Sequence, residues 1–259
     1  MTFLPLWLNA GFTILILMIL LWLLSLGIQN SSIVDIFWGA GFVITFWVAA
    51  WINPGPAAIQ TLLLGALVTL WGLRLSIYIF SRNHGQPEDF RYAAWRAEAG
   101  TAWWWRSFFK VFLLQGIIMW IVATPLIAAQ AGKAVSIEAL DFVGTGVWLI
   151  GFIFEAGGDW QLARFKKDSA HKGKLLTQGL WRLTRHPNYF GDAAQWWGFY
   201  ILSLASGAWW TIFSPALMTF LLMKVSGVAM LERTLTKSKP GYEEYMAQTN
   251  AFFPWFPKN

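Results

Sequence analysis

The chain of 259 residues contains no cysteine, which excludes disulfide bonds and thiolate metal ligands. Its three histidines are far apart in sequence and lack paired-ligand spacing, so no metal site is expected. The motifs GxSxG, P-loop and strand-based GxGxxG are also missing, because Gly144-Thr145-Gly146 lies in an apolar run and fails the spacing. Any nucleotide would therefore have to bind among helices.

Charged residues are scarce. They make up 12% of the chain, about half the share of an average soluble domain, whereas 57% of the residues are hydrophobic. The formal charge of +6 does not indicate nucleic acid, because the aromatic residues lie in apolar runs and are not interleaved with the basic ones. A chain of this composition needs a lipid bilayer to cover it.

Long apolar runs recur between short polar segments. Runs of ~20 residues suffice to cross a hydrocarbon core of ~30 Å as a helix, and about seven are present. They cover residues 5–28, 33–53, 58–81, 107–130, 140–163, 192–206 and 209–231. The sequence therefore predicts an all-α integral membrane protein with about seven transmembrane helices in one membrane domain, 1–259.

The basic residues are placed unevenly. All but Arg74 and Lys133 of the 19 lysines and arginines fall in 82–110, 164–185 and 224–258, the segments that follow the third, fifth and seventh runs. The positive-inside rule then predicts an N-terminus outside and a cytoplasmic C-terminus. The first run lacks a preceding basic region and a cleavage site, so we expect it to stay as a helix.

Ionisable residues inside apolar runs are costly and are usually functional or paired. Asp35 opens the second run, where it could cap a helix or protrude into a cavity. Arg74 lies in the third run and shares a helix face with Trp71, Tyr78 and Arg82. The alternative to a functional face is an intramembrane salt bridge from Arg74 to an acid such as Asp35.

The fifth run carries a polar stripe. Glu155, Asp159 and Lys166 recur at helical spacing and so align along one face. Carboxylates suit ribose hydroxyls and cations alike. The stripe fits either a nucleotide site or an ion-pair network.

The strongest local pattern is the segment 179–192, GLWRLTRHPNYFGD. Pro187 favours a helix start, which places Arg185 and His186 at a helix mouth that favours anions. On the following helix Asn188 and Asp192 continue a polar face. The alternative for the basic residues here is contact with anionic lipid headgroups.

This segment, followed by QWWG at 195–198, resembles the C-terminal domain of the steroid 5α-reductase family. The whole chain resembles the bacterial membrane homologues of the DUF1295 type. The features that match are Asp35 with Phe37-Trp38-Gly39, the segment 71–75, Arg82-Asn83, the segment 88–92, and Glu155 with Asp159.

The resemblance implies an enzyme in which NADPH reduces a carbon–carbon double bond conjugated to a ketone, in a 3-oxo-Δ4-steroid or a similar lipophilic enone. It implies substrate-side helices in 1–131 and a cofactor-binding half in 132–259. The residues that it implies for NADPH binding are Arg74, Arg82, Asn83, Arg91, Glu155, Asp159, Lys166, Lys174, Arg185, His186, Asn188, Tyr189 and Asp192.

The resemblance also implies where catalysis occurs. Hydride attack leaves negative charge on the ketone oxygen, so the site needs a hydrogen-bond donor there. Asp35 falls on the family's glutamate position, whereas the family's tyrosine position holds Trp71, whose indole can donate but is no practical acid. We expect a protonated Asp35 to be that donor, with Tyr78 in reserve.

Two other functions compete with the reductase. Isoprenylcysteine and phospholipid methyltransferases, which use S-adenosylmethionine, have a similar arginine–histidine–proline stretch. A lipid-binding membrane protein without catalysis would use the polar stripes to hold its helices together. A bacterial inner membrane is the expected location, and the natural substrate and the oligomeric state stay open.

Overall fold

The computed structural model describes residues 1–54, 58–132, 137–225 and 227–258, and all their regular structure is helical. Within these residues, six helical stretches are long and apolar enough to cross a membrane. They are Phe3–Ile28, Ile33–Ile52, Ile59–Asn83, Phe90–Val122, Ala139–Lys167 and Trp209–Ser238. A multi-pass membrane protein is therefore supported. The remaining predicted run, 192–206, falls in α10 (Pro187–Leu204), which is not among the six.

The chain forms two compact units. The N-terminal unit comprises Met1–Glu138 with Ser203–Thr211, and the C-terminal unit comprises Ala139–Leu202 with Ile212–Asn259. The functional division that we expect after residue 131 lies close to this boundary in sequence and stays a prediction.

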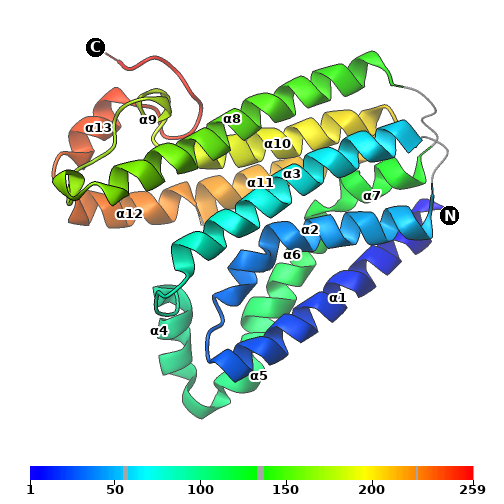
Figure 1. The fold of residues 1–259 in the computed structure, drawn as a ribbon, viewed down its shortest axis with the longest axis horizontal. Helices are drawn as coiled ribbons and strands as arrows, with labels where there is room; N and C mark the ends of the chain where they lie inside the picture. The colour runs from blue at the N-terminus through cyan, green and yellow to red at the C-terminus, as the bar shows by residue number, and fades with distance from the viewer. Residues whose placement is uncertain (55–57, 133–136, 226, 259) are drawn as a thin grey trace. The chain divides into compact units, whose positions relative to one another are not determined.

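The N-terminal unit is built around three long helices: α1 (Phe3–Ile28), α2 (Ile33–Ile52) and α3 (Ala58–Asn83). Helices α2 and α3 run side by side, and α1 packs on α2 (Figure 1). A Cβ added to Gly39 would lie 2.2 Å from the carbonyl oxygen of Gly72, so the two backbones meet where neither residue has a side chain. The exposed side chains of α1 include Leu4, Leu8 and Phe12, as expected for a helix that faces lipid.

The fourth stretch is a chain of short helical pieces: α4 (Phe90–Ala99), η1 (Gly100–Ala102), α5 (Trp103–Ser107), the π-helix η2 (Phe108–Leu113) and α6 (Leu114–Val122). It ends at Val122 because Pro125 has no N–H to continue the helix. The hydroxyl of Thr124 donates to the carbonyl oxygen of Ile121 at 2.7 Å, which satisfies an acceptor left by the proline. Helix α7 (Thr124–Ala131) follows, so the run predicted at 107–130 is divided.

The C-terminal unit pairs α8 (Ala139–Lys167) with α10. A Cβ on Gly151 would lie 2.6 Å from the carbonyl oxygen of Gly191, and one on Gly198 would lie 2.8 Å from the Trp148 backbone nitrogen. Glycines therefore let the two helices approach closely. The remaining pieces of this unit are η3 (Ser169–His171), α9 (Leu180–Leu183), α11 (Phe213–Phe220), η5 (Leu221–Val225), α12 (Val228–Ser238) and α13 (Tyr242–Gln248). The short helix η4 (Trp209–Ile212) spans the boundary in sequence between the two units.

Candidate functional site

A cluster of polar side chains surrounds Asp35 in the first turn of α2. The Tyr92 hydroxyl donates a hydrogen bond to Oδ1 of Asp35 at 2.8 Å, and the Arg91 guanidinium lies 3.2 Å from Oδ2. Nε2 of Gln115 donates to the Tyr92 hydroxyl at 3.0 Å and lies 3.4 Å from Oδ1 of Asp35. Three elements, α2, α4 and α6, thus bring an acid, a phenol, an amide and a guanidinium together. We call these four residues the Asp35 cluster.

The loop before α4 fixes this arrangement. Asp89 is the N-cap of α4 and accepts a hydrogen bond from the Arg91 backbone at 3.0 Å. Its carboxylate also accepts from Nε of Arg91 at 2.8 Å, which holds the guanidinium between two acids. The Asp89 backbone N–H in turn donates to Oγ of Ser32, the residue before α2, at 2.7 Å. The start of α4 is therefore tied to the start of α2, where Asp35 lies.

A second tie uses Glu88. The carboxylate of Glu88 accepts from Nε of Arg96 at 2.8 Å and from the Ser31 backbone N–H at 2.6 Å. Burial raises the pKa of Glu88, but the hydrogen bonds from Arg96 and Ser31 outweigh burial and hold the pKa below its ordinary value. For Asp89, burial is likewise outweighed, by the hydrogen bonds from Arg91, and its pKa is also lowered. Both carboxylates are thus charged at neutral pH.

A cavity of about 300 Å³ lies beside these ties. Its polar lining comes from the loop before α2 and from the end of α3 with the loop that follows. The lining residues are Ile28, Asn30, Ser32, Ile33, Ile36, Phe80, Asn83, His84, Gly85, Gln86, Pro87 and Asp89. Asn83, expected to bind the cofactor, thus faces the same cavity as Asp89, which anchors Arg91.

Helix α3 also carries the other predicted catalytic and cofactor-binding residues of this region: Trp71, Arg74, Tyr78 and Arg82. Trp71 is fully buried, with its ring centroid 5.6 Å from that of Phe42. Arg74 and Tyr78 are half-buried. The exposed Arg82 guanidinium lies 5.9 Å from the Tyr78 ring centroid. The proposed roles of Trp71 and Tyr78 in catalysis stay predictions.

In the C-terminal unit, the polar stripe of α8 meets that of α10. Nε2 of Gln195 donates to Oε2 of Glu155 at 2.5 Å, and Nδ2 of Asn188 donates to Oδ1 of Asp159 at 3.1 Å. Both carboxylates are buried, as is Asp192. Glu155 and Asp159, two of the acids predicted to contact a cofactor, are therefore each paired with an amide across the two helices.

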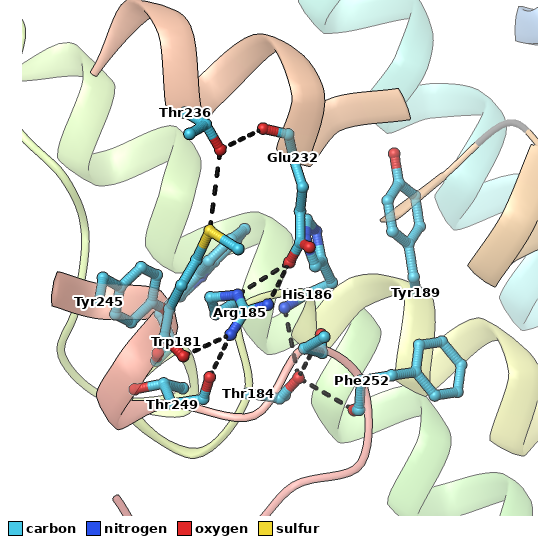
Figure 2. A network of polar contacts seen from close by, with 12 residues as sticks. Trp181, Thr184, Arg185, His186, Tyr189, Glu232, Thr236, Tyr245, Thr249 and Phe252 are labelled. Atoms are coloured by element: carbon cyan, nitrogen blue, oxygen red, sulfur yellow. Dashed lines mark hydrogen bonds and ion pairs between the residues drawn. The ribbon is translucent and has the colours of Figure 1, made fainter. Parts of the chain in front are cut away.

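Arg185 lies at the start of α10 and is only 7% exposed. Its Nε and Nη2 donate to Oε1 of Glu232 at 2.8 and 2.6 Å, and Nη1 donates to the carbonyl oxygens of Met246, at 3.1 Å, and Thr249. Figure 2 shows the Arg185 guanidinium and the His186 ring both directed at the Glu232 carboxylate. Nε2 of His186 lies 3.3 Å from the same oxygen. Arg185 therefore uses its side chain to hold α12 and the C-terminal segment.

The C-terminal segment 242–258 is held along its length by residues 181–185. Oγ1 of Thr184 donates to the Phe252 carbonyl at 2.9 Å, and the backbone N–H groups of Arg185 and Trp255 donate to the carbonyls of Asn250 and Leu183, each at 2.9 Å. The Tyr245 hydroxyl donates to the Trp181 carbonyl. We call these contacts, together with the hydrogen bonds of the Arg185 side chain to Glu232, Met246 and Thr249, the C-terminal clasp.

Three further residues were predicted to bind the cofactor: Tyr189, Lys166 and Lys174. Tyr189 stacks on His186, with ring centroids 5.7 Å apart and planes 17° apart. Lys166 and Lys174 are exposed. Among the described residues, no group of three or more histidine, aspartate or glutamate side chains is arranged to hold a metal ion.

The family described as "Protein of unknown function (DUF1295)" matches residues 21–249, which is most of the chain. The chain belongs to the DUF1295 family. Its similarity extends to the uncharacterized protein C594.04c of Schizosaccharomyces pombe, to which it is 26% identical over 264 residues, covering 90% of this chain and 75% of that protein. No solved structure matches the chain.

Three residues of this DUF1295 protein complete the two networks but were not expected from sequence as site residues. Tyr92 is the last residue of the segment 88–92. Its position next to Arg91, a predicted cofactor residue, could have indicated that it belongs to the site. Gln115 is a polar residue inside an apolar run, the same kind of signal that singled out Asp35. Glu232 follows the last apolar run and carries no motif, so only the fold connects it to Arg185.

Proposed function

We propose that this DUF1295 protein is an NADPH-dependent reductase that saturates the conjugated double bond of a lipophilic enone, such as a 3-oxo-Δ4-steroid, in the manner of the steroid 5α-reductase family. The observation that carries the proposal is the Asp35 cluster. It offers a phenol, hydrogen-bonded to both an acid and an amide, beside the first turn of α2, which is a candidate membrane span.

The cluster supplies what the reduction of an enone requires. NADPH, when bound, supplies the hydride that adds to the β-carbon. Negative charge then develops on the ketone oxygen, and a donor placed there lowers the barrier. The Tyr92 hydroxyl accepts a hydrogen bond from Gln115 and donates to Asp35, so it can turn its proton from the carboxylate to that oxygen. Tyr92 thereby removes the need for Trp71 to act as an acid.

Arg91 has a supporting role in this proposal. Its guanidinium contacts both Asp35 and Asp89, so a negative charge on either carboxylate has a cation beside it. After Tyr92 has given its proton to the ketone oxygen, a protonated Asp35 can return a proton to the phenolate, and the resulting carboxylate then lies beside Arg91. Arg91 is therefore a positioning residue for Asp35 as well as a predicted phosphate ligand.

The residues of the C-terminal unit fit the chemistry of NADPH. Glu155 and Asp159 are buried acceptors whose amide partners could give way to the hydroxyl or amide groups of a dinucleotide. The phosphates need cations, and the exposed Lys172, Lys174 and Arg182 lie in the segment between α8 and α10. Arg185 is not needed in this set, because its guanidinium is engaged in the C-terminal clasp.

The test begins with binding. Purified protein in detergent is heated with NADPH, NADH or S-adenosylmethionine, and we expect a thermal shift with NADPH alone. NADPH oxidation is then followed with progesterone-like enones. A shift with S-adenosylmethionine alone would indicate the methyltransferase, and no shift with any of them, together with no NADPH oxidation, would indicate lipid binding without catalysis.

A further inference from the structure

A second cavity, of about 330 Å³, lies in the N-terminal unit between α4 and η2 and takes no part in the proposed reaction. Its lining combines aromatic rings with two cations and one acid. The lining residues are Trp95, Glu98, Ala99, Trp103, Trp105, Arg106, Phe109 and Lys110.

The aromatic side chains of this cavity are of the kind found at a membrane–water interface. Trp103 is buried in its wall, whereas Trp105 and Phe109 are 43% and 56% exposed at its edge. Tryptophan is enriched at the depth of lipid headgroups because its ring is amphipathic. The cavity also belongs to the basic segment 82–110, and its lining residues lie in the first part of the fourth candidate span, Phe90–Val122. These features are the ones expected of a cavity at headgroup depth.

The cations of the cavity are incompletely neutralised. Arg106 and Lys110 are one helical turn apart, so two like charges share one face and repel each other. Each lies over an indole ring: the Lys110 ammonium is 4.4 Å from the Trp95 ring centroid, and the Arg106 guanidinium is 5.5 Å from that of Trp105. Glu98 lies 4.0 Å from the Lys110 ammonium. With one acid against two bases, the lining keeps one positive charge and suits a ligand that carries one negative charge.

We infer that this cavity binds the phosphate of an anionic phospholipid headgroup from the surrounding bilayer. A phosphodiester carries one negative charge and can accept hydrogen bonds from Arg106 and Lys110 together. The exposed rings of Trp105 and Phe109 flank the position where the glycerol and the first acyl carbons would emerge. The site is independent of the reductase proposal, because none of its residues belongs to the Asp35 cluster or to the C-terminal clasp.

The test measures lipid binding by native mass spectrometry of the delipidated protein in detergent, with added phosphatidylglycerol or phosphatidylcholine. We expect selective binding of phosphatidylglycerol by the wild type and a loss of roughly tenfold or more in affinity in the double variant Arg106→Ala/Lys110→Ala. The variant Arg106→Lys/Lys110→Arg keeps both charges and should retain binding. Arg164→Ala is the matched control, because Arg164 also lies over an indole ring, that of Trp160, but lines no part of this cavity.

Each other outcome contradicts the inference. Equal binding of phosphatidylcholine would show that the negative charge is not recognised. Equal binding of phosphatidylglycerol by wild type and double variant would place the lipid elsewhere on the protein. Glycerol phosphate without acyl chains is added as a third probe, and binding as tight as that of the lipid would identify a site for a soluble phosphate. All variants are first compared with wild type by thermal unfolding without added lipid, since the two substituted side chains are exposed and should leave the fold intact.

Discussion

The hydroxyl of Tyr92 lies 2.8 Å from Oδ1 of Asp35, although the two residues are 57 positions apart in the chain. The contact exists because Asp89 and Glu88 tie the start of α4 to the turn before α2. A phenol beside a carboxyl group can give its proton to a substrate and regain one from the protonated carboxyl, which the indole of Trp71 cannot do. Tyr92 is therefore the residue on which the proposed reaction depends most.

Replacement of Tyr92 by phenylalanine should lower kcat for enone reduction by roughly 10²–10⁴-fold, because a positioned proton donor contributes about this much. The thermal shift caused by NADPH should not change, since the phenol is not among the expected cofactor contacts. Tyr200→Phe makes the same chemical change in α10 and should leave kcat near the wild-type value. Full activity in Tyr92→Phe would reject this residue as the donor and return the role to Asp35 or Tyr78.

Glu88→Gln should lower the thermal midpoint at neutral pH by weakening the tie to Arg96 and Ser31. The folded-state pKa of Glu88 lies below the ordinary value of 4.5, so its charge stabilises the fold above that value. This stabilisation is lost as the pH falls through the lowered pKa. The midpoints of wild type and Glu88→Gln should therefore converge in acid.

The control for Glu88 is Glu98→Gln. The Glu98 side chain is 75% exposed, and its ion pair with Lys110 is long, at 4.0 Å. Its effect on the midpoint should be small at every pH. If the gap between wild type and Glu88→Gln stayed constant from neutral to acidic pH, the carboxylate charge would not be the source of the stability.

The fold was predictable from sequence where the physical cause was local. Long apolar runs predicted the positions of five candidate spans closely, because each span must be apolar enough to lie in lipid. The division of the fourth run at Pro125 was visible in the sequence as a residue without an N–H. Helix α10 is not among the six candidate spans, because polar residues lower its mean hydropathy. Two of these residues, Gln195 and Asn188, pair with α8 and are not exposed.

The site was less predictable because its contacts join distant segments. Arg185 stands in the pattern that suggested an anion site, yet its donors meet Glu232 and two carbonyls near the C-terminus, and no sequence spacing connects these groups. The polar stripe of α8 left a nucleotide site and a helix-pairing network open. The amide partners of Glu155 and Asp159 show that pairing between helices is at least part of its role.

Gly191→Ala should destabilise the C-terminal unit by about 1–3 kcal/mol, because added volume in a tightly packed contact forces the helices apart. A Cβ at this position would lie 2.3 Å from the Glu155 backbone nitrogen and 2.4 Å from the Gly151 carbonyl oxygen. Gly146→Ala is the matched control in α8, where a Cβ would meet nothing within 4 Å. It should leave the thermal midpoint unchanged or raise it, since alanine is the better helix former. Equal midpoints for both variants would argue against close packing of α8 on α10.

Arg185→Ala should release the C-terminal clasp. It removes the Arg185 donors from the carbonyl oxygens of Met246 and Thr249 and from the Glu232 carboxylate, which keeps its contact with His186, and loss of one partner from a buried pair costs about 3–5 kcal/mol. Hydrogen exchange of the amides in 242–258 should increase, and limited proteolysis should cut this segment first. Arg182→Ala, at an exposed position three residues earlier, should change neither measurement. Loss of NADPH binding without faster exchange would instead assign Arg185 to a phosphate, as the resemblance implies.

The membrane topology can be decided by labelling, because the chain has no cysteine and each introduced thiol is the only one present. Placement of the basic segments predicts an N-terminus outside and a cytoplasmic C-terminus, which requires α10 to cross the bilayer in addition to the six stretches already long and apolar enough. Thr2→Cys should therefore react with an impermeant maleimide in intact cells, and Lys258→Cys only after the membrane is opened. Labelling of both thiols, or of neither, in intact cells would place the two termini on the same side of the membrane. In that case α10 would not cross the bilayer.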